Sequence, residues 1–353
     1  MPLTVLSVSY PLAQVSPRTA GGAEQVLSLL DAALVREGHR SLVLAPAGSR
    51  CYGLLIPAQV PTGVLHEAAK RESQKEFKRL LERALNDYSV DIIHMHGLDF
   101  IEYLPNCETP VLVSLHLPLS WYPRHALIPP HPRLNFVCVS KSQAGTAPPG
   151  MQIARIIPNG IEIARFQLAR RKSNYALAIG RICPEKGLHL AIDAAEHASI
   201  DLVIAGSVFE YPEHRAYFEL MIRPRLNDRI RFIGPVGGVR KAHLLAGARC
   251  LLLPSLAPET SALCTMEAMA SGTPVVAFRT GALPEIVSPG RTGFLVDEAQ
   301  EMSEAIRHVS SVSPHACRHE AEQRFCSDRM FREYLDLYRS VLAPENFAEL
   351  VAA

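Results

Sequence analysis

The chain has 353 residues, of which 48% are hydrophobic and 20% charged, and a formal net charge of +1. A near-neutral charge without long runs of one sign argues against a nucleic-acid partner, and no apolar stretch reaches the ~18 residues of a transmembrane segment. The length suits two domains of about 150 to 180 residues each. The eight cysteines show no metal-ligand spacing, so we expect reduced thiols in a cytoplasmic protein.

The first predicted elements form a strand–helix–strand unit. Residues 3–10 are rich in β-branched and aromatic residues and lack the basic flank and cleavage site of a signal peptide, which predicts a strand. Gly21 and Gly22 then open a helix whose apolar residues repeat every 3.6 residues from Ala23 to Glu37. Adjacent glycines let the backbone approach a ligand closely, although a plain turn is the alternative. The dinucleotide signature G-x-G-x-x-G is absent, which disfavours a nicotinamide oxidoreductase.

Residues 66–88 predict a long polar helix. Its charges are mixed in sign, whereas a lipid-binding face would be mostly basic. The pattern favours a solvated helix, with weak membrane association as the alternative.

Histidines follow two predicted strands, residues 91–95 and 111–115. His94 and His96 have no third ligand at metal-binding spacing, so we interpret them as structural. His116 lies just past the end of its strand, where open α/β sheets bind ligands. An ordinary surface histidine is the alternative for His116.

A polar segment, residues 168–174, predicts a linker, and a new strand begins at Tyr175. After it, Arg181 and Lys186 flank Pro184, a residue that suits the first position of a helix. Two cations beside a helix start can bind a diphosphate, while a solvated surface pair is the alternative. Further strands lead to a glycine-rich turn within residues 231–238, and a capped, amphipathic helix spans Ser327 to Leu342.

The stretch of residues 258–274, PETSALCTMEAMASGTP, holds two glutamates with the spacing E-x7-E. Glu259 lies in a loop after an apolar strand at residues 250–254, and Glu267 lies among strong helix formers, Ala262 to Ala270. Two carboxylates placed this way can accept hydrogen bonds from two separate hydroxyl groups, as sugar binding requires. Stabilisation of the helix dipole is the alternative reading of the pattern.

Together these motifs resemble the retaining glycosyltransferases of family four. The resemblance rests on residues 258–278, on GALPEIV and TGFLV after them, on GR and KG at 180–187, and on IPNGIE at 157–162. It implies the GT-B fold, with two Rossmann-like α/β domains whose parallel sheets face each other across a cleft. It further implies an acceptor-binding domain over residues 1–167, a sugar-nucleotide domain over 168–326, and a helix over 327–353 that crosses back to the first domain.

The resemblance also implies an activity. A retaining enzyme of this family moves a sugar from a nucleotide sugar, with UDP favoured over GDP, to a small-molecule, lipid or glycan acceptor by front-face attack. No DxD motif is evident, so we expect neither a metal nor a cofactor. The implied catalytic residues are His116, Arg181, Lys186 and Glu259. The implied donor-binding residues are Gly21, Gly22, Arg181, Lys186, Ile233, Gly234, Glu259, Thr260, Ser261, Ala262, Leu263 and Glu267.

Individual roles follow from the same resemblance. Arg181 and Lys186 would stabilise the departing diphosphate, Glu259 would bind a hydroxyl of the sugar, and Glu267 would bind the ribose. Where the family usually has x-Phe-Gly after Pro-Glu, this chain has Thr260, Ser261 and Ala262. Either Ser261 caps the following helix, or the loop selects a particular donor sugar. A sugar-nucleotide epimerase of the same fold and a non-catalytic sugar-nucleotide binding protein are the alternative functions.

Overall fold

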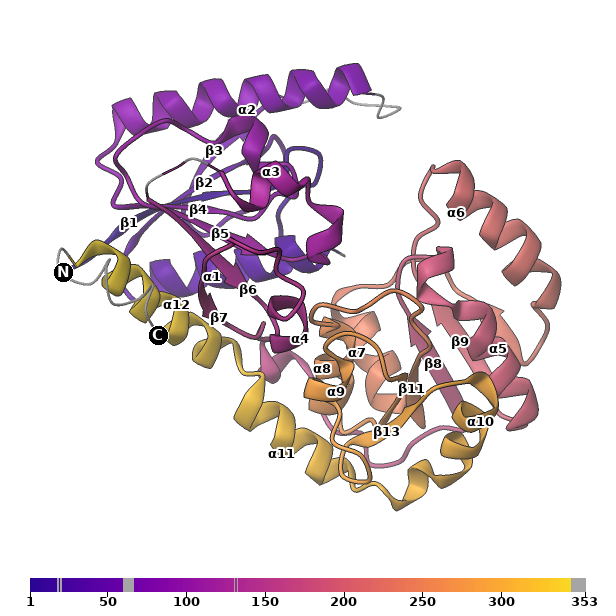
Figure 1. Cartoon of the computed structure of the whole chain (residues 1–353). Helices are drawn as coiled ribbons and strands as arrows, with labels where there is room; N and C mark the ends of the chain where they lie inside the picture. The colour runs from indigo at the N-terminus through magenta and orange to yellow at the C-terminus, as the bar shows by residue number, and fades with distance from the viewer. Residues whose placement is uncertain (18, 20, 60–66, 130, 132, 344–353) are drawn as a thin grey trace. The chain divides into compact units, whose positions relative to one another are not determined.

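Two parallel β-sheets organise the chain, one in each of two units (Figure 1). The structure is a computed structural model that describes residues 1–343 except 18, 20, 60–66, 130 and 132. The first unit comprises Met1–Asn159 and the segment that begins at Ser327, and the second comprises Gly160–Cys326. The two units are described in turn.

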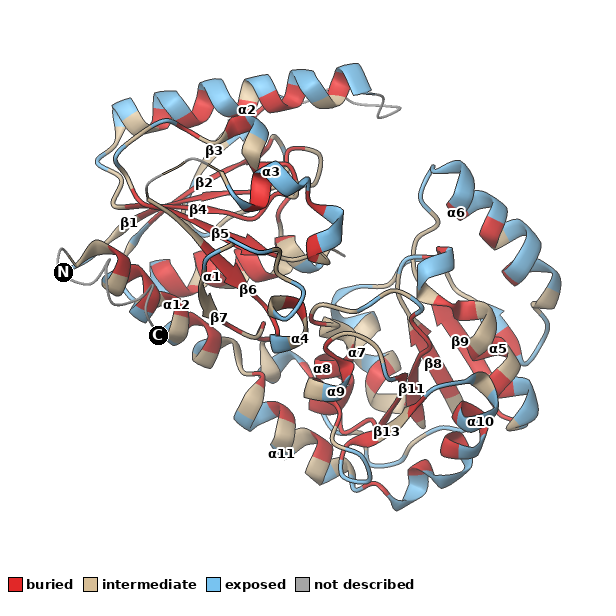
Figure 2. Ribbon diagram, viewed as in Figure 1, coloured by how far each residue is buried: buried red, intermediate tan, exposed pale blue. Residues whose placement is uncertain are grey.

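The sheet of the first unit has the strand order β3-β2-β1-β4-β5-β6-β7, and all of its described pairs are parallel. Consecutive residues of the central strands are buried (Figure 2), so both faces of the sheet are covered, as is usual for parallel sheets. The strands are β1 (Thr4–Val8), β2 (Arg40–Pro46), β3 (Leu54–Ala58), β4 (Ile92–Met95), β5 (Val111–Leu115), β6 (Leu134–Cys138) and β7 (Ile153–Ile156). The α-helices are α1 (Gly22–Arg36), α2 (Glu67–Asp87), α3 (Arg124–Leu127), α4 (Lys141–Ala144) and α12 (Ser327–Leu342).

Helix α2 has one buried and one charged face. Phe77, Leu81 and Ala84 are buried, whereas the opposite side is exposed along its length (Figure 2). Arg79 pairs with Glu76 and Arg83 with Asp87 on that exposed side. The predicted start of this helix at His66 lies outside the described residues. Within those residues, no helix is both long and apolar enough to cross a membrane.

Helix α12 packs against the first unit through two tyrosines. Tyr334 and Tyr338 are buried, and the helix contacts α1. The Tyr338 hydroxyl lies 2.7 Å from Nδ1 of His94, and the Tyr334 hydroxyl lies 2.7 Å from Oγ of Ser114. The apolar face predicted for this segment therefore also carries hydrogen bonds to strands β4 and β5.

The sheet of the second unit has the order β10-β9-β8-β11-β12-β13, again with parallel pairs. Apolar clusters cover both of its faces. The strands are β8 (Tyr175–Ile179), β9 (Asp201–Ala205), β10 (Ile230–Phe232), β11 (Cys250–Leu253), β12 (Val275–Phe278) and β13 (Gly293–Val296). The helices are α5 (Leu188–His197), α6 (Pro212–Tyr217), α7 (Gly238–Gly247), α8 (Leu263–Ala270), α9 (Leu283–Ile286), α10 (Ala299–His308) and α11 (Pro314–Arg324).

The division between the units falls at Asn159 and Gly160, before the predicted boundary at residues 167 and 168. Ile161 forms an isolated β-bridge with Cys326, and the buried Phe166 joins the apolar core of the second unit. Residues 168–174 are therefore not a linker between the units. The polar character of the segment has a cause in the tertiary structure, because Lys172 donates through Nζ to Ala246 O, Ser271 O and Thr273 Oγ1.

All eight cysteines are free thiols. Cys138, Cys183, Cys250 and Cys317 are buried, and the other four are half-buried. Of the three cysteines that lie in apolar runs of the sequence, Cys138 and Cys250 are buried and Cys264 is half-buried.

Candidate functional site

The two predicted cations of the second unit lie on the segment after β8. Arg181 is exposed, and Lys186 ends a 3-10 turn, Pro184–Lys186. The helix predicted to start at Pro184 instead begins at Leu188 as α5, because Gly187 adopts a left-handed conformation with φ of 59°. A side chain at Gly187 would collide with the carbonyl oxygen of Pro254, so glycine is needed for this close approach.

Lys186 is brought directly onto Glu259. The Lys186 Nζ lies 2.6 Å from Oε1 of Glu259, and the Ser255 hydroxyl donates to the same oxygen. The two charged side chains are only 22% and 11% exposed, which strengthens their attraction relative to a surface pair. The loop that carries Glu259 is also tied to the 3-10 turn, since Leu256 N donates to Glu185 O at 2.8 Å.

Glu267 has a partner that the sequence interpretation missed. Lys241, on α7, places Nζ 2.5 Å from Oε1 of Glu267, and the two side chains are 16% and 4% exposed. Burial raises the pKa of Glu267, and the charge and hydrogen bond of Lys241 offset part of that rise. The sequence did contain a signal for this pair, because Lys241 is the fourth residue of the helix that follows the glycine-rich turn.

Both ion pairs lie near the first turn of α8. Burial raises the pKa of the Cys264 thiol to about 11, and the charges of Glu259, Lys186, Glu267 and Lys241 act on it in addition. Two carboxylates and two ammonium groups thus gather at the carboxyl end of β11. In open parallel sheets, ligands bind at the carboxyl ends of the strands. The arrangement therefore suits a ligand with both hydroxyl and phosphate groups.

The loop before α8 has an unusual backbone. Ala262 occupies the N-cap position with φ of 46° and ψ of 62°, a left-handed conformation that glycine adopts at lower cost. Ser261 is buried and lies one residue before the N-cap, so the interpretation of Ser261 as the capping residue is wrong. Its role in selecting a donor sugar stays a prediction, as does that of the half-buried Thr260 and Leu263.

Ala262→Gly is expected to stabilise the protein by up to about 1 kcal/mol. Relief of the left-handed strain, about 1–2 kcal/mol, exceeds the entropy that glycine adds to the unfolded chain, about 0.4–1 kcal/mol. Urea unfolding measures the difference. Ala216→Gly, at an exposed position in α6, is the matched control and should destabilise by about 1 kcal/mol. A loss of stability in Ala262→Gly as large as in the control would contradict the strain argument.

Ile233 and Gly234 follow β10 and are half-buried. Gly234 has φ of 71°, and its carbonyl oxygen accepts a hydrogen bond from Gly206 N at 2.9 Å. Ile233 N donates to Ile204 O at 3.0 Å. These backbone groups are held in place by the neighbouring strand, and the role of Ile233 and Gly234 in donor binding stays a prediction.

In the first unit, Gly21 and Gly22 lie at the start of α1. A side chain at Gly21 would collide with the carboxylate of Glu24, which is buried in the first turn of the helix. Burial raises the pKa of Glu24, although a hydrogen bond from its own backbone lowers it. Because this carboxylate is the end of a flexible side chain that can move aside, the contact alone does not require glycine at position 21.

His116 belongs to a row of three histidines, of which His94 lies on β4 and the other two lie just past the ends of β4 and β5. Its Nε2 lies 3.0 Å from Nδ1 of His96, and the two rings are stacked. Burial lowers the pKa of His116 to about 4 and that of His94 to about 3. His94 bonds through both ring nitrogens, to Tyr338 and Ser114. All of these imidazoles are therefore neutral near pH 7, since burial also lowers the pKa of His96.

One metal-compatible cluster occurs among the described residues, at Cys183, Glu185 and His214. Ligand spacing in the sequence does not predict this cluster, because His214 is distant in the chain from the other two residues. None of the predicted site residues belongs to the cluster, although Arg181 and Lys186 lie on the same segment.

Comparison with known proteins places this geometry in a family. The model named glycosyl transferases group 1 matches residues 160–324, and the model named glycosyltransferase family 4 matches residues 20–165. A D-inositol 3-phosphate glycosyltransferase from Saccharomonospora viridis is 30% identical over 220 residues, which are 56% of this chain and 50% of that protein. The chain thus spans about half the length of the curated relatives it matches.

Solved structures agree on the fold. The crystal structure of AviGT4, a glycosyltransferase involved in avilamycin A biosynthesis, is 27% identical and has a TM-score of 0.75 over 97% of this chain and 99% of that chain. Anabaena HepE in complex with UDP-glucose is 19% identical, with a TM-score of 0.73 over 96% of this chain and 100% of that chain. The predicted fold is confirmed, and with two family models that together match residues 20–324, the chain belongs to the family-four glycosyltransferases with the GT-B fold.

Proposed function

We propose that the protein is a retaining glycosyltransferase that transfers a sugar from a nucleoside diphosphate sugar, preferentially a UDP-sugar, to a small-molecule, lipid or glycan acceptor. The observation that carries the proposal is the pairing of Lys186 with Glu259 and of Lys241 with Glu267 around the first turn of α8. This pattern offers carboxylate acceptors for hydroxyl groups and cations for a diphosphate around the start of one helix. The likeness in fold to a protein that binds UDP-glucose makes that donor the first to test.

The proposed chemistry is a front-face displacement. The acceptor oxygen bonds to the anomeric carbon as the bond from that carbon to the diphosphate oxygen breaks, and the diphosphate takes up the acceptor's proton. Arg181 and Lys186 stabilise the negative charge that develops on the leaving group. Glu259 binds a hydroxyl of the sugar, and Glu267 binds the ribose.

His116 has a different part in this proposal. Because burial keeps its pKa at about 4, the imidazole is neutral near pH 7 and adds no charge to the reaction. We assign it hydrogen bonding to a hydroxyl group of the sugar, for which a neutral imidazole suffices.

A thermal-shift screen against nucleotides and sugar nucleotides tests the proposal. A ligand that binds only the folded state stabilises it by RT ln(1+[L]/Kd), so the correct donor raises the melting temperature more than the other nucleotides do. Incubation of the best donor alone then separates a transferase from an epimerase, which converts the donor without an acceptor. If no sugar nucleotide raises the melting temperature, the proposal fails. If the donor binds and no acceptor class is glycosylated, the protein is a non-catalytic binder.

Calorimetry should separate the two glutamates. Glu267→Ala is expected to weaken binding of both the free nucleoside diphosphate and the intact donor, because both contain the ribose. Glu259→Ala is expected to weaken only the intact donor. A hydrogen bond to a charged group contributes about 1.5–3 kcal/mol, which is roughly one to two decades in affinity. Glu304→Ala, at an exposed position of α10, is the control. Equal losses for both ligands in both variants would refute the assignment.

Turnover is expected to be independent of a divalent metal ion. The diphosphate charge is met by Arg181 and Lys186 in this proposal, so no ion is needed as a Lewis acid. Initial rates with the identified donor and acceptor should agree within a few-fold with and without EDTA. Activity that disappears in EDTA and returns only with Mg²⁺ or Mn²⁺ would contradict the expectation.

A further inference from the structure

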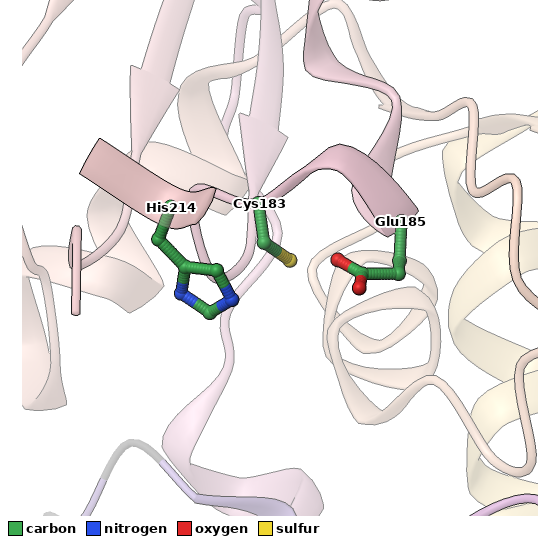
Figure 3. A group of neighbouring side chains, drawn as sticks. All are labelled: Cys183, Glu185 and His214. Atoms are coloured by element: carbon green, nitrogen blue, oxygen red, sulfur yellow. The ribbon is translucent and has the colours of Figure 1, made fainter. Parts of the chain in front are cut away.

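Three side chains with metal-binding chemistry meet beside the segment that carries Arg181 and Lys186. Cys183 precedes the 3-10 turn, Glu185 lies within it, and His214 belongs to α6. One potential ligand atom from each residue lies within 4.8 Å of the other two. Figure 3 shows the imidazole and the carboxylate turned toward the thiol from opposite sides.

His214 is the member of the cluster whose surroundings call for an explanation. The residue is 8% exposed, and its buried Nδ1 has no hydrogen-bond partner among the described residues. The ring packs against Phe209 and Tyr211, which supply no acceptor or donor to it. Buried polar atoms in native proteins are nearly always hydrogen-bonded, so this nitrogen is an exception. Figure 3 shows the other ring nitrogen, Nε2, on the side of the Cys183 thiol, so Nε2 is the nitrogen that would bind an ion in the cluster.

The Cys183 thiol already interacts with another member of the cluster. It is buried, it lies 3.7 Å from Arg181 O, and it forms a side-chain hydrogen bond with Glu185. Burial raises the pKa of this thiol to about 11, with Glu185 adding to the rise. The free thiol is therefore protonated near pH 7, and a metal ion that binds it releases that proton to solvent.

We propose that Cys183, Glu185 and His214 bind a Zn²⁺ ion, with water in the fourth position. Thiolate, imidazole and carboxylate are the ligands that zinc uses in proteins, whereas Mg²⁺ and Ca²⁺ prefer oxygen alone. Zinc–ligand bonds of about 2.0–2.3 Å in a tetrahedron place neighbouring ligand atoms roughly 3.5 Å apart. The cluster reaches that spacing by closing about 1 Å, for which the exposed Glu185 side chain has the freedom.

The ion would join two parts of the second unit. It would tie the 3-10 turn to α6, and the turn is already tied to the Glu259 loop through the bonds of Leu256 N and Ala257 N to Glu185 O. Zinc would thus hold the segment that carries Lys186 without taking part in the transfer reaction. The expected result of binding is a more stable second unit.

The test uses the full chain after removal of metal by a chelator. Calorimetric titration with Zn²⁺ should give one ion per chain, and the melting temperature should rise with added zinc. Titration with Co²⁺ should give the intense near-ultraviolet band of a cobalt–thiolate bond. Cys183→Ser should abolish that band, and Glu185→Gln, His214→Ala and His214→Gln should each weaken binding at least about tenfold, since even outer partners of a ligand cost 10–100-fold.

Controls distinguish this site from other thiols and imidazoles. Cys107→Ser and His308→Ala, at half-buried and exposed positions outside the cluster, should leave the cobalt band and the affinity unchanged. The wild-type cobalt spectrum requires no substitution, so a variant that fails to fold does not prevent the test. A spectrum without a thiolate band, or equal affinities in wild type, Cys183→Ser and His214→Gln, would overturn the proposal. Neither result depends on whether the protein transfers sugar.

Discussion

Arg181→Ala and Lys186→Ala are each expected to lower turnover by about 10²–10³-fold while the fold survives. The size follows from the loss of one preorganised partner of a developing negative charge. Arg181 is exposed and makes no ion pair with a described residue, so its guanidinium is available to a diphosphate. Lys186 differs, because its Nζ already lies 2.6 Å from Glu259. Removal of Lys186 therefore also leaves the Glu259 carboxylate with the Ser255 hydroxyl as its one remaining side-chain partner among the described residues.

The two variants should be distinguishable by their kinetics. Arg181→Ala should lower kcat with little change in affinity for a sugar that lacks the nucleotide. Lys186→Ala should change both kcat and recognition of the sugar, since Glu259 is released as well. Single-turnover rates with saturating donor measure the first effect, and kcat/KM across several sugars on one nucleotide measures the second. Arg240→Ala, an exposed cation on α7, is the control and should keep normal rates. Rates within a few-fold of wild type in both variants would remove these residues from the mechanism.

The sequence predicted the elements well where local pattern and tertiary structure agree. The helix predicted over Ser327 to Leu342 is α12 with the same bounds, because its apolar face and its terminal residues both predict a helix over this range. Strand β11 lies within the apolar run predicted at residues 250–254 for a similar reason. A strand that is buried on both faces needs no alternation of polar and apolar residues. Both family and fold could be predicted because the motifs occupy loops at the ends of such strands.

The remaining errors arose where distant parts of the chain meet. The segment around Lys172 has the composition of a linker, yet three oxygen atoms from other elements hold its ammonium group. The partnership of Lys241 with Glu267 and the approach of His214 to Cys183 likewise depend on tertiary contacts that no local spacing encodes. The left-handed conformation of Ala262 was also unexpected. Alanine disfavours that conformation, and the surrounding structure imposes it.

Lys241→Ala is expected to destabilise the protein by about 3–5 kcal/mol near neutral pH. Breaking a buried ion pair by removing one partner leaves an uncompensated charge, and Glu267 is 4% exposed. Urea unfolding followed by circular dichroism measures the loss. Lys241→Met combined with Glu267→Gln is the matched control, because replacing both members of a buried pair by neutral groups is often close to neutral for stability. If the double variant lost as much stability as Lys241→Ala, packing and not charge would explain the effect.

The loss in Lys241→Ala should also depend on pH with a defined sign. Burial already raises the pKa of Glu267, and removing Lys241 takes away the main influence that lowers it, so in the variant the pKa rises further. The folded variant then binds a proton more tightly than the unfolded chain, whose glutamate titrates near its usual value of about 4.3. Stability of the variant is therefore retained at acid pH and lost as pH rises through the pKa of the folded state. Unfolding free energies of variant and wild type should differ least near pH 5 and most near pH 8. A difference that is constant across this range would mean that Glu267 keeps its charge without Lys241, and that the charge is compensated by another group such as Arg165, which also lowers the pKa of Glu267.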